Sequence, residues 1–125
     1  MSCEIQSVYR GAFPRLPFER IAKSILGARY ELSLVICSDA LATAMNKKYR
    51  KKSYSPNVLS FPLSKREGEI FLNARVARRE AAKYGVSFKQ RLVLLFAHGC
   101  LHLKGMKHGP KMGSIEARMA KKYGR

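Results

Sequence analysis

Tryptophan is absent from this sequence, acidic residues number only eight, and no apolar run is long enough to cross a membrane. The longest apolar run covers residues 92–97, far fewer than the roughly 20 residues that span a bilayer as a helix. A helix on a membrane surface usually carries aromatic anchors such as tryptophan along a long amphipathic face. The first residues show no basic segment followed by an apolar segment, which is the pattern of a secretion signal. We therefore expect a cytoplasmic protein that does not bind membranes.

Cysteine is also scarce, and its spacing excludes two further classes of protein. Cys3, Cys37 and Cys100 are an odd number, and no two of them form a CxxC pair. A disulfide framework needs an even set of cysteines, and thiolate zinc sites are usually built from closely spaced pairs. We therefore interpret all three as ordinary small residues of a protein in a reducing compartment.

The shortage of acidic residues leaves the chain strongly basic. Lysine and arginine number 25 against 8 aspartate and glutamate residues, which gives a formal net charge of +17. Repulsion among so many positive side chains destabilises the folded state. A net charge of this size is typical of proteins that associate with nucleic acids. RNA or DNA is therefore the expected partner.

The composition and the hydrophobic pattern predict one α+β domain over residues 1–125, with a small mixed sheet of about four strands flanked by about five helices. Pro62 is expected to end the third strand. The fourth helix is apolar all round in its middle, which is typical of a helix buried at the centre of a domain. Strands are expected at residues 4–8, 32–37, 58–61 and 69–72, and helices at residues 17–26, 40–50, 74–84, 88–104 and 113–123.

All three histidines of the chain lie within residues 98–108. His98 and His102 are four positions apart in the fourth predicted helix, so they project from one face and are close enough to hold the same metal ion. Gly105 can adopt the left-handed conformation that ends a helix, and the chain that turns back after it can deliver His108. Three neutral imidazoles suit one zinc ion per chain, and they leave a fourth position for water, as in catalytic zinc sites. We therefore predict a catalytic zinc site.

Two other uses of the zinc remain open at this point. A structural site, as in a non-catalytic RNA-associated factor, would need a fourth protein ligand, and Cys100 lies roughly 200° around the helix from His98. A zinc peptidase has the same HxxxHxxGxxH spacing, but its general base is a glutamate where this chain has Gly99. Because loss of a general base costs on the order of 10² to 10⁴ in rate, the peptidase is the weaker alternative.

Hydrolysis of a phosphodiester bond fits the sequence better than peptide hydrolysis. Attack at phosphorus mainly requires that charge on the phosphate oxygens be neutralised. Arg50 is the preferred candidate for this role, since a guanidinium grips phosphate oxygens through two parallel hydrogen bonds. We therefore predict that Arg50 and the zinc held by His98 carry catalysis on RNA.

Lysines flank both parts of the predicted site, and we expect them to line one groove that follows an RNA backbone. The affinity for RNA should then fall steeply as the salt concentration rises. Four of these lysines flank Arg50 and three flank the histidine motif: Lys47, Lys48, Lys51, Lys52, Lys104, Lys107 and Lys111.

Several motifs of the chain resemble those of one known family. The segment HGCLHLKGMKH resembles the HGxLHLxGxDH zinc motif of the YbeY-type endoribonucleases, which mature ribosomal RNA. The resemblance runs in order from about Leu34 to Met119. Its further matches are an N-x-x-Y-R element at Asn46, Tyr49 and Arg50, a V-L-S-F-P element at residues 58–62, and a G-[DE]-I element at residues 68–70.

The resemblance implies a fold, a site and an activity. It implies an α+β domain with a roughly four-stranded sheet, zinc bound by the three histidines, and a catalytic role for Arg50. The implied activity is cleavage of single-stranded RNA in maturation of ribosomal RNA at the 3′ end of the small subunit, and in ribosome quality control. The small ribosomal subunit would then be a partner, and the alternative is a non-catalytic ribosome-associated factor with a structural zinc.

Two positions depart from the family pattern. Lys107 stands where the family usually has an aspartate directly before the third histidine. An aspartate there could orient a ligand, whereas lysine cannot accept a hydrogen bond from an imidazole N–H. The pair Pro56 and Asn57 replaces threonine and aspartate before the V-L-S-F-P element, which raises the local positive charge.

Overall fold

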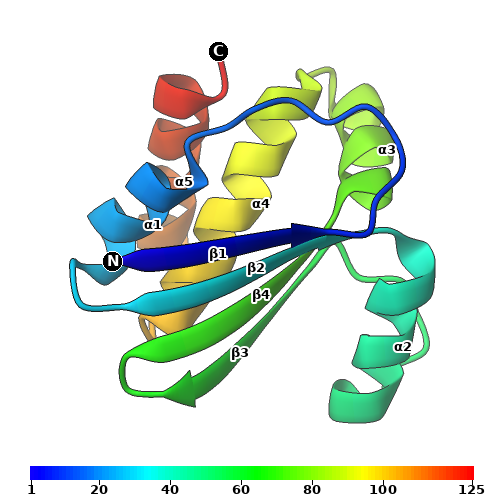
Figure 1. Cartoon of the computed structure of the whole chain (residues 1–125). Coiled ribbons are helices and arrows are strands. Elements are labelled where there is room, and N and C mark those ends of the chain that lie inside the picture. The colour runs from blue at the N-terminus through cyan, green and yellow to red at the C-terminus, as the bar shows by residue number, and fades with distance from the viewer.

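A four-stranded mixed sheet organises the computed structural model, which describes residues 1–125 (Figure 1). Its strand order is β1-β2-β4-β3. Strands β1 (Ser2–Ser7), β2 (Glu31–Cys37) and β4 (Glu67–Asn73) are parallel to one another. Strand β3 (Val58–Ser64) is antiparallel to β4 and forms one edge of the sheet.

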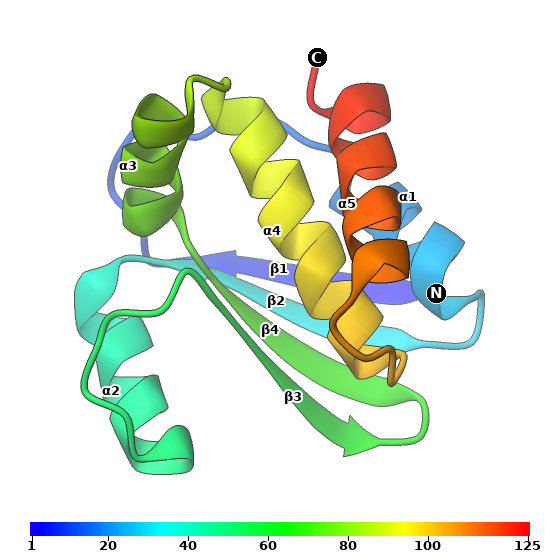
Figure 2. The ribbon, with the colours of Figure 1, turned by 180° about the vertical axis from the view of Figure 1, so that it is seen from behind.

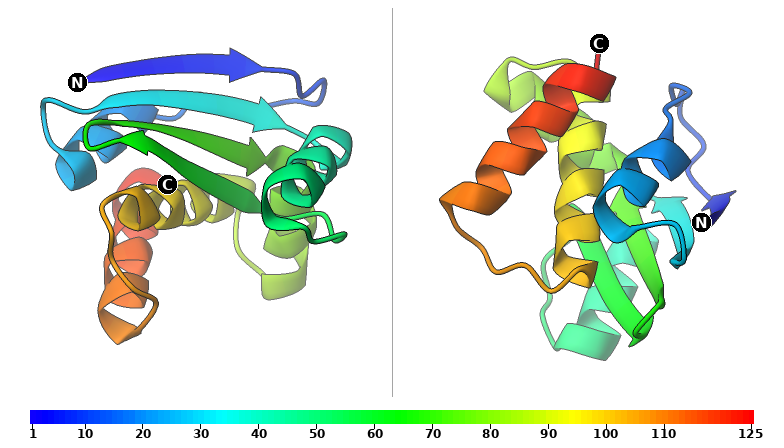
Figure 3. Two further views of the ribbon diagram at one scale, coloured as in Figure 1. Left: turned by 90° about the horizontal axis from the view of Figure 1, so that it is seen from below. Right: turned by 90° about the vertical axis from the view of Figure 1, so that its left-hand side faces the viewer.

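The five helices divide between the two faces of the sheet (Figure 3). Helices α1 (Phe18–Leu26), α3 (Ala74–Tyr84), α4 (Phe88–Leu103) and α5 (Pro110–Tyr123) share the larger core on one face. Helix α2 (Asp39–Arg50) packs on the other face, at the end where β2 and β4 finish. The prediction of an α+β fold with four strands and five helices is confirmed.

The alternation of side chains along β2 explains why both faces of the sheet are covered. Successive residues of a strand point to opposite faces. Leu34 and Ile36 join the larger core beneath α4, while Val35 and Cys37 join a smaller cluster with Ala42 of α2. A strand buried on both sides reads as a continuous apolar run, and residues 34–37 of β2 form such a run.

Helix α4 lies at the centre of the larger core, as predicted. Its first turn is closed by a capping box, in which Ser87 and Gln90 exchange two hydrogen bonds of 3.0 Å. Leu92, Phe96 and Leu101 are almost completely buried along it. The helix also approaches the sheet closely at Gly99, where a Cβ atom would lie 3.0 Å from the Ser60 hydroxyl. A side chain at this position would therefore push α4 away from β3.

Two predicted boundaries are wrong, both at prolines. Strand β3 continues through Pro62 to Ser64, because β3 pairs only with β4 and an edge strand can lack one backbone donor. Its register shifts between Pro62 and Ser64. Helix α5 begins at Pro110 rather than at Gly113, since proline has a suitable φ for the first turn of a helix. The other boundaries differ from the prediction by at most two residues.

The helices also bear on the expectation about membranes. None of the five is both long enough and apolar enough to cross a membrane.

Candidate metal centre

The three histidines meet at the carboxyl end of α4. His98 and His102 project from its last two turns, and His108 lies in the loop that leads to α5. The nitrogen atoms that each ring can offer to a metal lie within 4.8 Å of one another, and no cysteine or carboxylate belongs to this cluster. The Nε2 atoms of His98 and His102 are 3.0 Å apart. The arrangement could hold one metal ion.

The turn after α4 delivers His108 to the other two histidines. Gly105 has a φ of 93°, a conformation that L side chains adopt rarely. Its N–H donates to the carbonyl of His102 at 2.9 Å, and the N–H of Met106 donates to the carbonyl of Leu101 at 3.0 Å. These two bonds form a Schellman motif, and Met106 packs against the larger core beside it. The loop that carries His108 is therefore fixed where it leaves the helix.

Glu116 is a functional candidate that the sequence reasoning missed. It projects from α5, and its Oε2 lies 2.5 Å from Nδ1 of His98. Both side chains are largely shielded, with 12% and 23% of their surface exposed. A carboxylate that accepts a hydrogen bond from one ring nitrogen fixes the imidazole with its other nitrogen toward a metal. One feature of the sequence could have indicated Glu116: it is the only acidic residue after Glu80, and so the only acid near the histidine motif in the chain.

The position of Glu116 also bears on the departure at Lys107. Lys107 is exposed in the loop before His108 and has no hydrogen bond or salt bridge. The carboxylate that orients a histidine comes instead from α5, a different element of the fold. The site therefore has a carboxylate partner although the motif itself contains none.

We expect Glu116→Gln to lower the affinity for zinc by roughly 10- to 100-fold, because the amide carries no charge and no longer fixes the ring of His98 as strongly. Competition with a chromophoric chelator measures this affinity. Glu19→Gln, which removes an exposed acid on α1, is the matched control and should leave the affinity unchanged. Equal affinities for Glu116→Gln and the wild type would show that Glu116 does not orient a ligand.

Electrostatics favour the neutral form of His102. Burial lowers its pKa, and the neighbouring His98, His108 and Arg50 lower it further. Neutral imidazole is the form that binds metal ions.

Arg50 is connected to the helix of the metal centre through Ser60 of β3. It is the last residue of α2, and its Nη2 donates to the carbonyl of Ser60 in β3 at 3.1 Å. The Ser60 hydroxyl in turn donates to the carbonyl of Gly99, next to His98, at 3.0 Å. Figure 2 shows α2 and the loop after α4 on opposite sides of β3. The edge strand thus joins the two halves of the predicted site.

The neighbours of His98 in α4 do not contribute ligands. Gly99 packs against β3 and β4, so a glutamate there would meet the sheet rather than the metal centre. Cys100 is fully buried in the larger core, and burial raises the pKa of its thiol well above the usual value. A protonated, buried thiol is a poor ligand. Both observations weaken the peptidase and the structural-zinc alternatives.

The predicted RNA-binding lysines lie in three places. Lys47, Lys48, Lys51 and Lys52 are exposed around Arg50, and Lys107 and Lys111 are exposed around His108. Lys104 lies on the side of α1. There it lines a cavity of about 380 Å³ together with residues 24–27 and Lys65. The structure therefore does not bring Lys104 to α2, and the single groove stays a prediction for the other six lysines.

Comparisons with known proteins agree on one family. Residues 7–124 match the family model described as endoribonuclease YbeY. An endoribonuclease YbeY from Geobacter metallireducens is 37% identical over 118 residues, which cover 84% of this chain and 77% of that protein. One from Helicobacter pylori is 37% identical over 102 residues, which cover 78% and 72%. The solution structure of a Thermotoga maritima protein superposes with a TM-score of 0.68 at 20% identity, covering 96% of this chain and 87% of that one, and it shares the fold.

Proposed function

The chain belongs to the endoribonuclease YbeY family, and from this premise we propose that it is a zinc-dependent hydrolase that cleaves single-stranded RNA. The observation that carries the proposal is the cluster of three histidine nitrogens without a fourth protein ligand. An arginine at the edge of the sheet is connected to the helix of this cluster through Ser60. A structural zinc site is normally closed by four protein ligands, whereas a catalytic one has three.

The donor set fits zinc better than other common cations. Three imidazole nitrogens without a carboxylate or thiolate suit Zn²⁺, while Mg²⁺ and Ca²⁺ prefer oxygen ligands. When bound, zinc supplies a Lewis acid that activates water and withdraws charge from the phosphate oxygens. His98, His102 and His108 would hold the ion, and Glu116 would fix the ring of His98 through Nδ1.

Arg50 binds the phosphate in this proposal. Its guanidinium has five N–H donors, and one of its nitrogens is directed to the Ser60 carbonyl. This contact holds the side chain at β3 and leaves further donors for the oxygens of a phosphodiester. Because charge grows on these oxygens as the reaction proceeds, a guanidinium held in place lowers the barrier without reorganising.

The substrate we propose is ribosomal RNA, near the 3′ end of the small subunit, and the small ribosomal subunit is then the partner. The net charge of +17 and the exposed lysines around Arg50 and His108 support a polyanionic substrate. Cleavage of ribosomal RNA would place the protein in the cytoplasm. The peptidase alternative is not supported, because Gly99 leaves no room for its glutamate.

Metal removal tests the proposal. We expect a chelator to reduce cleavage of a single-stranded RNA by about 10³-fold, since the zinc supplies several kcal/mol of stabilisation and each 1.36 kcal/mol corresponds to a factor of about ten. Addition of one equivalent of zinc per chain should restore the rate, and elemental analysis should find one zinc per chain. RNA cleavage that survives complete removal of the metal would contradict the proposal.

A further inference from the structure

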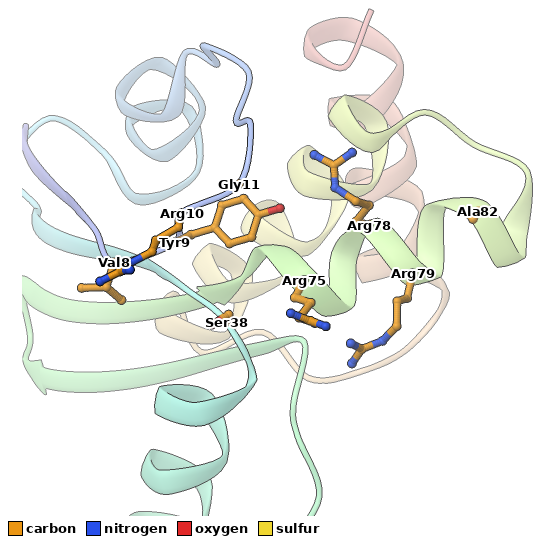
Figure 4. Close-up of a pocket in the computed structure, with 9 residues that line it drawn as sticks. All are labelled: Val8, Tyr9, Arg10, Gly11, Ser38, Arg75, Arg78, Arg79 and Ala82. Carbon is orange, nitrogen blue, oxygen red and sulfur yellow. The ribbon is translucent and has the colours of Figure 1, made fainter.

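A basic cavity lies at the opposite end of α2 from Arg50. Its volume is about 790 Å³, and it is formed where β1 and β2 end and by the exposed side of α3 (Figure 4). Nothing in the metal centre uses its residues. Four of the nine residues that line it are arginines and none is acidic; the arginines are Arg10, Arg75, Arg78 and Arg79.

One acidic residue beside the cavity offsets only part of this charge. Asp39 accepts two hydrogen bonds from Arg79, at 3.0 and 3.1 Å, and lies 3.5 Å from Arg75. The bonds from Arg79 hold the pKa of Asp39 well below its usual range, so the carboxylate is ionised at neutral pH. Arg10 and Arg78 have no acidic partner. The cavity therefore has four cations against one anion.

Three of the four guanidinium groups are held in place by the fold. Arg78 donates to the carbonyl of Ala12 at 2.9 Å, and its guanidinium stacks over the ring of Phe88 at 4.1 Å. Arg75 and Arg79 are four positions apart on α3, and both contact the carboxylate of Asp39, the first residue of α2. Groups held in this way lose little entropy when an anion binds.

We propose that this cavity anchors phosphate groups of an RNA strand whose continuation reaches Arg50 at the other end of α2. The proposal rests on the proposed function, because it concerns the same substrate. Guanidinium forks fit phosphate oxygens through paired hydrogen bonds. Helix α2 has 12 residues, so its ends are about 18 Å apart at 1.5 Å per residue. A strand of stacked nucleotides rises about 3.4 Å per phosphate, so that length spans roughly five phosphates.

The exposed aromatic residues near Arg50 favour a nucleic acid over an acidic peptide. Tyr49 and Tyr54 are 55% and 58% exposed, and they lie among the lysines at the end of α2. Exposed aromatic rings between cations are a platform on which bases stack. An acidic peptide would use the cations but would leave the exposed surface of these rings uncovered.

Binding of two labelled single-stranded RNAs tests the anchor, one of about four nucleotides and one of about 16 nucleotides. Fluorescence anisotropy at low temperature gives the dissociation constant Kd, and a gel confirms that the RNA is intact. We expect Arg10→Ala/Arg75→Ala to raise Kd for the longer RNA about tenfold or more at low salt, and to change Kd for the shorter RNA less than about twofold. The slope of log affinity against log salt should fall by about 1.4 for the longer RNA, because two phosphate contacts on a single strand are lost.

The matched control is Arg20→Ala/Arg29→Ala, which removes the same charge from exposed positions on α1 and in the turn between α1 and β2. Equal losses in the two double variants would show a general charge effect and would overturn the anchor, as would equal losses for the two RNAs. If Arg10→Ala/Arg75→Ala lost binding of a labelled oligoglutamate without any change in RNA binding, the cavity would be assigned to a peptide. That result would also overturn the proposed RNA anchor. If the double variant does not fold, Arg10→Ala alone replaces it, because Arg10 makes no contact that stabilises the fold. This single variant should raise Kd about threefold for the longer RNA only, since it loses one phosphate contact.

Cleavage of the longer RNA, measured in parallel, separates this inference from the proposed function. If the wild type bound the longer RNA more tightly than the shorter one, in a way that depends on the cavity arginines, but did not cleave it, the proposed nuclease function would be contradicted and the anchor supported. Cleavage by the wild type together with unchanged binding by Arg10→Ala/Arg75→Ala would contradict the anchor alone.

Discussion

His98→Ala is expected to reduce the rate of RNA cleavage by about 10³-fold or more, the largest effect of any single substitution in this chain. His98 is placed between Glu116 on one ring nitrogen and His102 on the other, so its loss removes a ligand and the contact that orients it. A bound metal ion supplies several kcal/mol to hydrolysis, and each 1.36 kcal/mol corresponds to a factor of about ten. Single-turnover cleavage at saturating RNA measures the effect, and elemental analysis should show that the variant has lost its zinc.

A matched control separates this effect from misfolding. Lys89→Ala changes an exposed position of the same helix and should cleave at the wild-type rate. The circular dichroism of His98→Ala should resemble that of the wild type, because His98 lies outside the larger core. If preparations of His98→Ala and the wild type cleaved RNA equally, the activity would come from a contaminating nuclease.

Arg50→Ala is expected to reduce cleavage by roughly 10²- to 10³-fold while the zinc content stays unchanged. Removal of one donor that stabilises charge in a transition state typically costs this much. The guanidinium is not a metal ligand, and its contacts in the fold are one hydrogen bond to the carbonyl of Ser60 and a place over the ring of Phe61, 5.7 Å from the ring centroid. The rate at saturating RNA reports the loss in the chemical step, whereas Kd for RNA should change much less.

The conservative variant decides whether the geometry of the guanidinium matters. Arg50→Lys should recover only a small part of the rate, because an ammonium group cannot form the paired bonds of a guanidinium with phosphate. Arg20→Ala, an equal loss of charge on α1, should cleave at the wild-type rate. An Arg50→Ala variant that keeps full activity would remove Arg50 from the mechanism and would leave the metal centre without a partner for the phosphate.

Most of the local structure was predictable because it depends on neighbours in the chain. The spacing of apolar residues predicted all five helices and all four strands. The capping box at Ser87 and the glycine turn at Gly105 act within a few residues, so their sequence signals were sufficient. Pro62 misled the prediction, since a proline ends a central strand but not an edge strand, and the place of β3 in the sheet is a tertiary property.

The sequence by itself determined the positive charge, the α+β class and the three histidines, because a metal motif on one helix and the turn after it is local chemistry. Only the tertiary structure decided which residues surround that motif. Glu116 reaches His98 from α5, and hydrogen bonds through Ser60 connect Arg50 to Gly99, the residue after His98. Such contacts join segments that are far apart in the sequence, so no spacing along the chain encodes them. The tertiary fold also places Lys104 away from the other predicted RNA-binding lysines. It brings four arginines together at the end of α2 opposite Arg50.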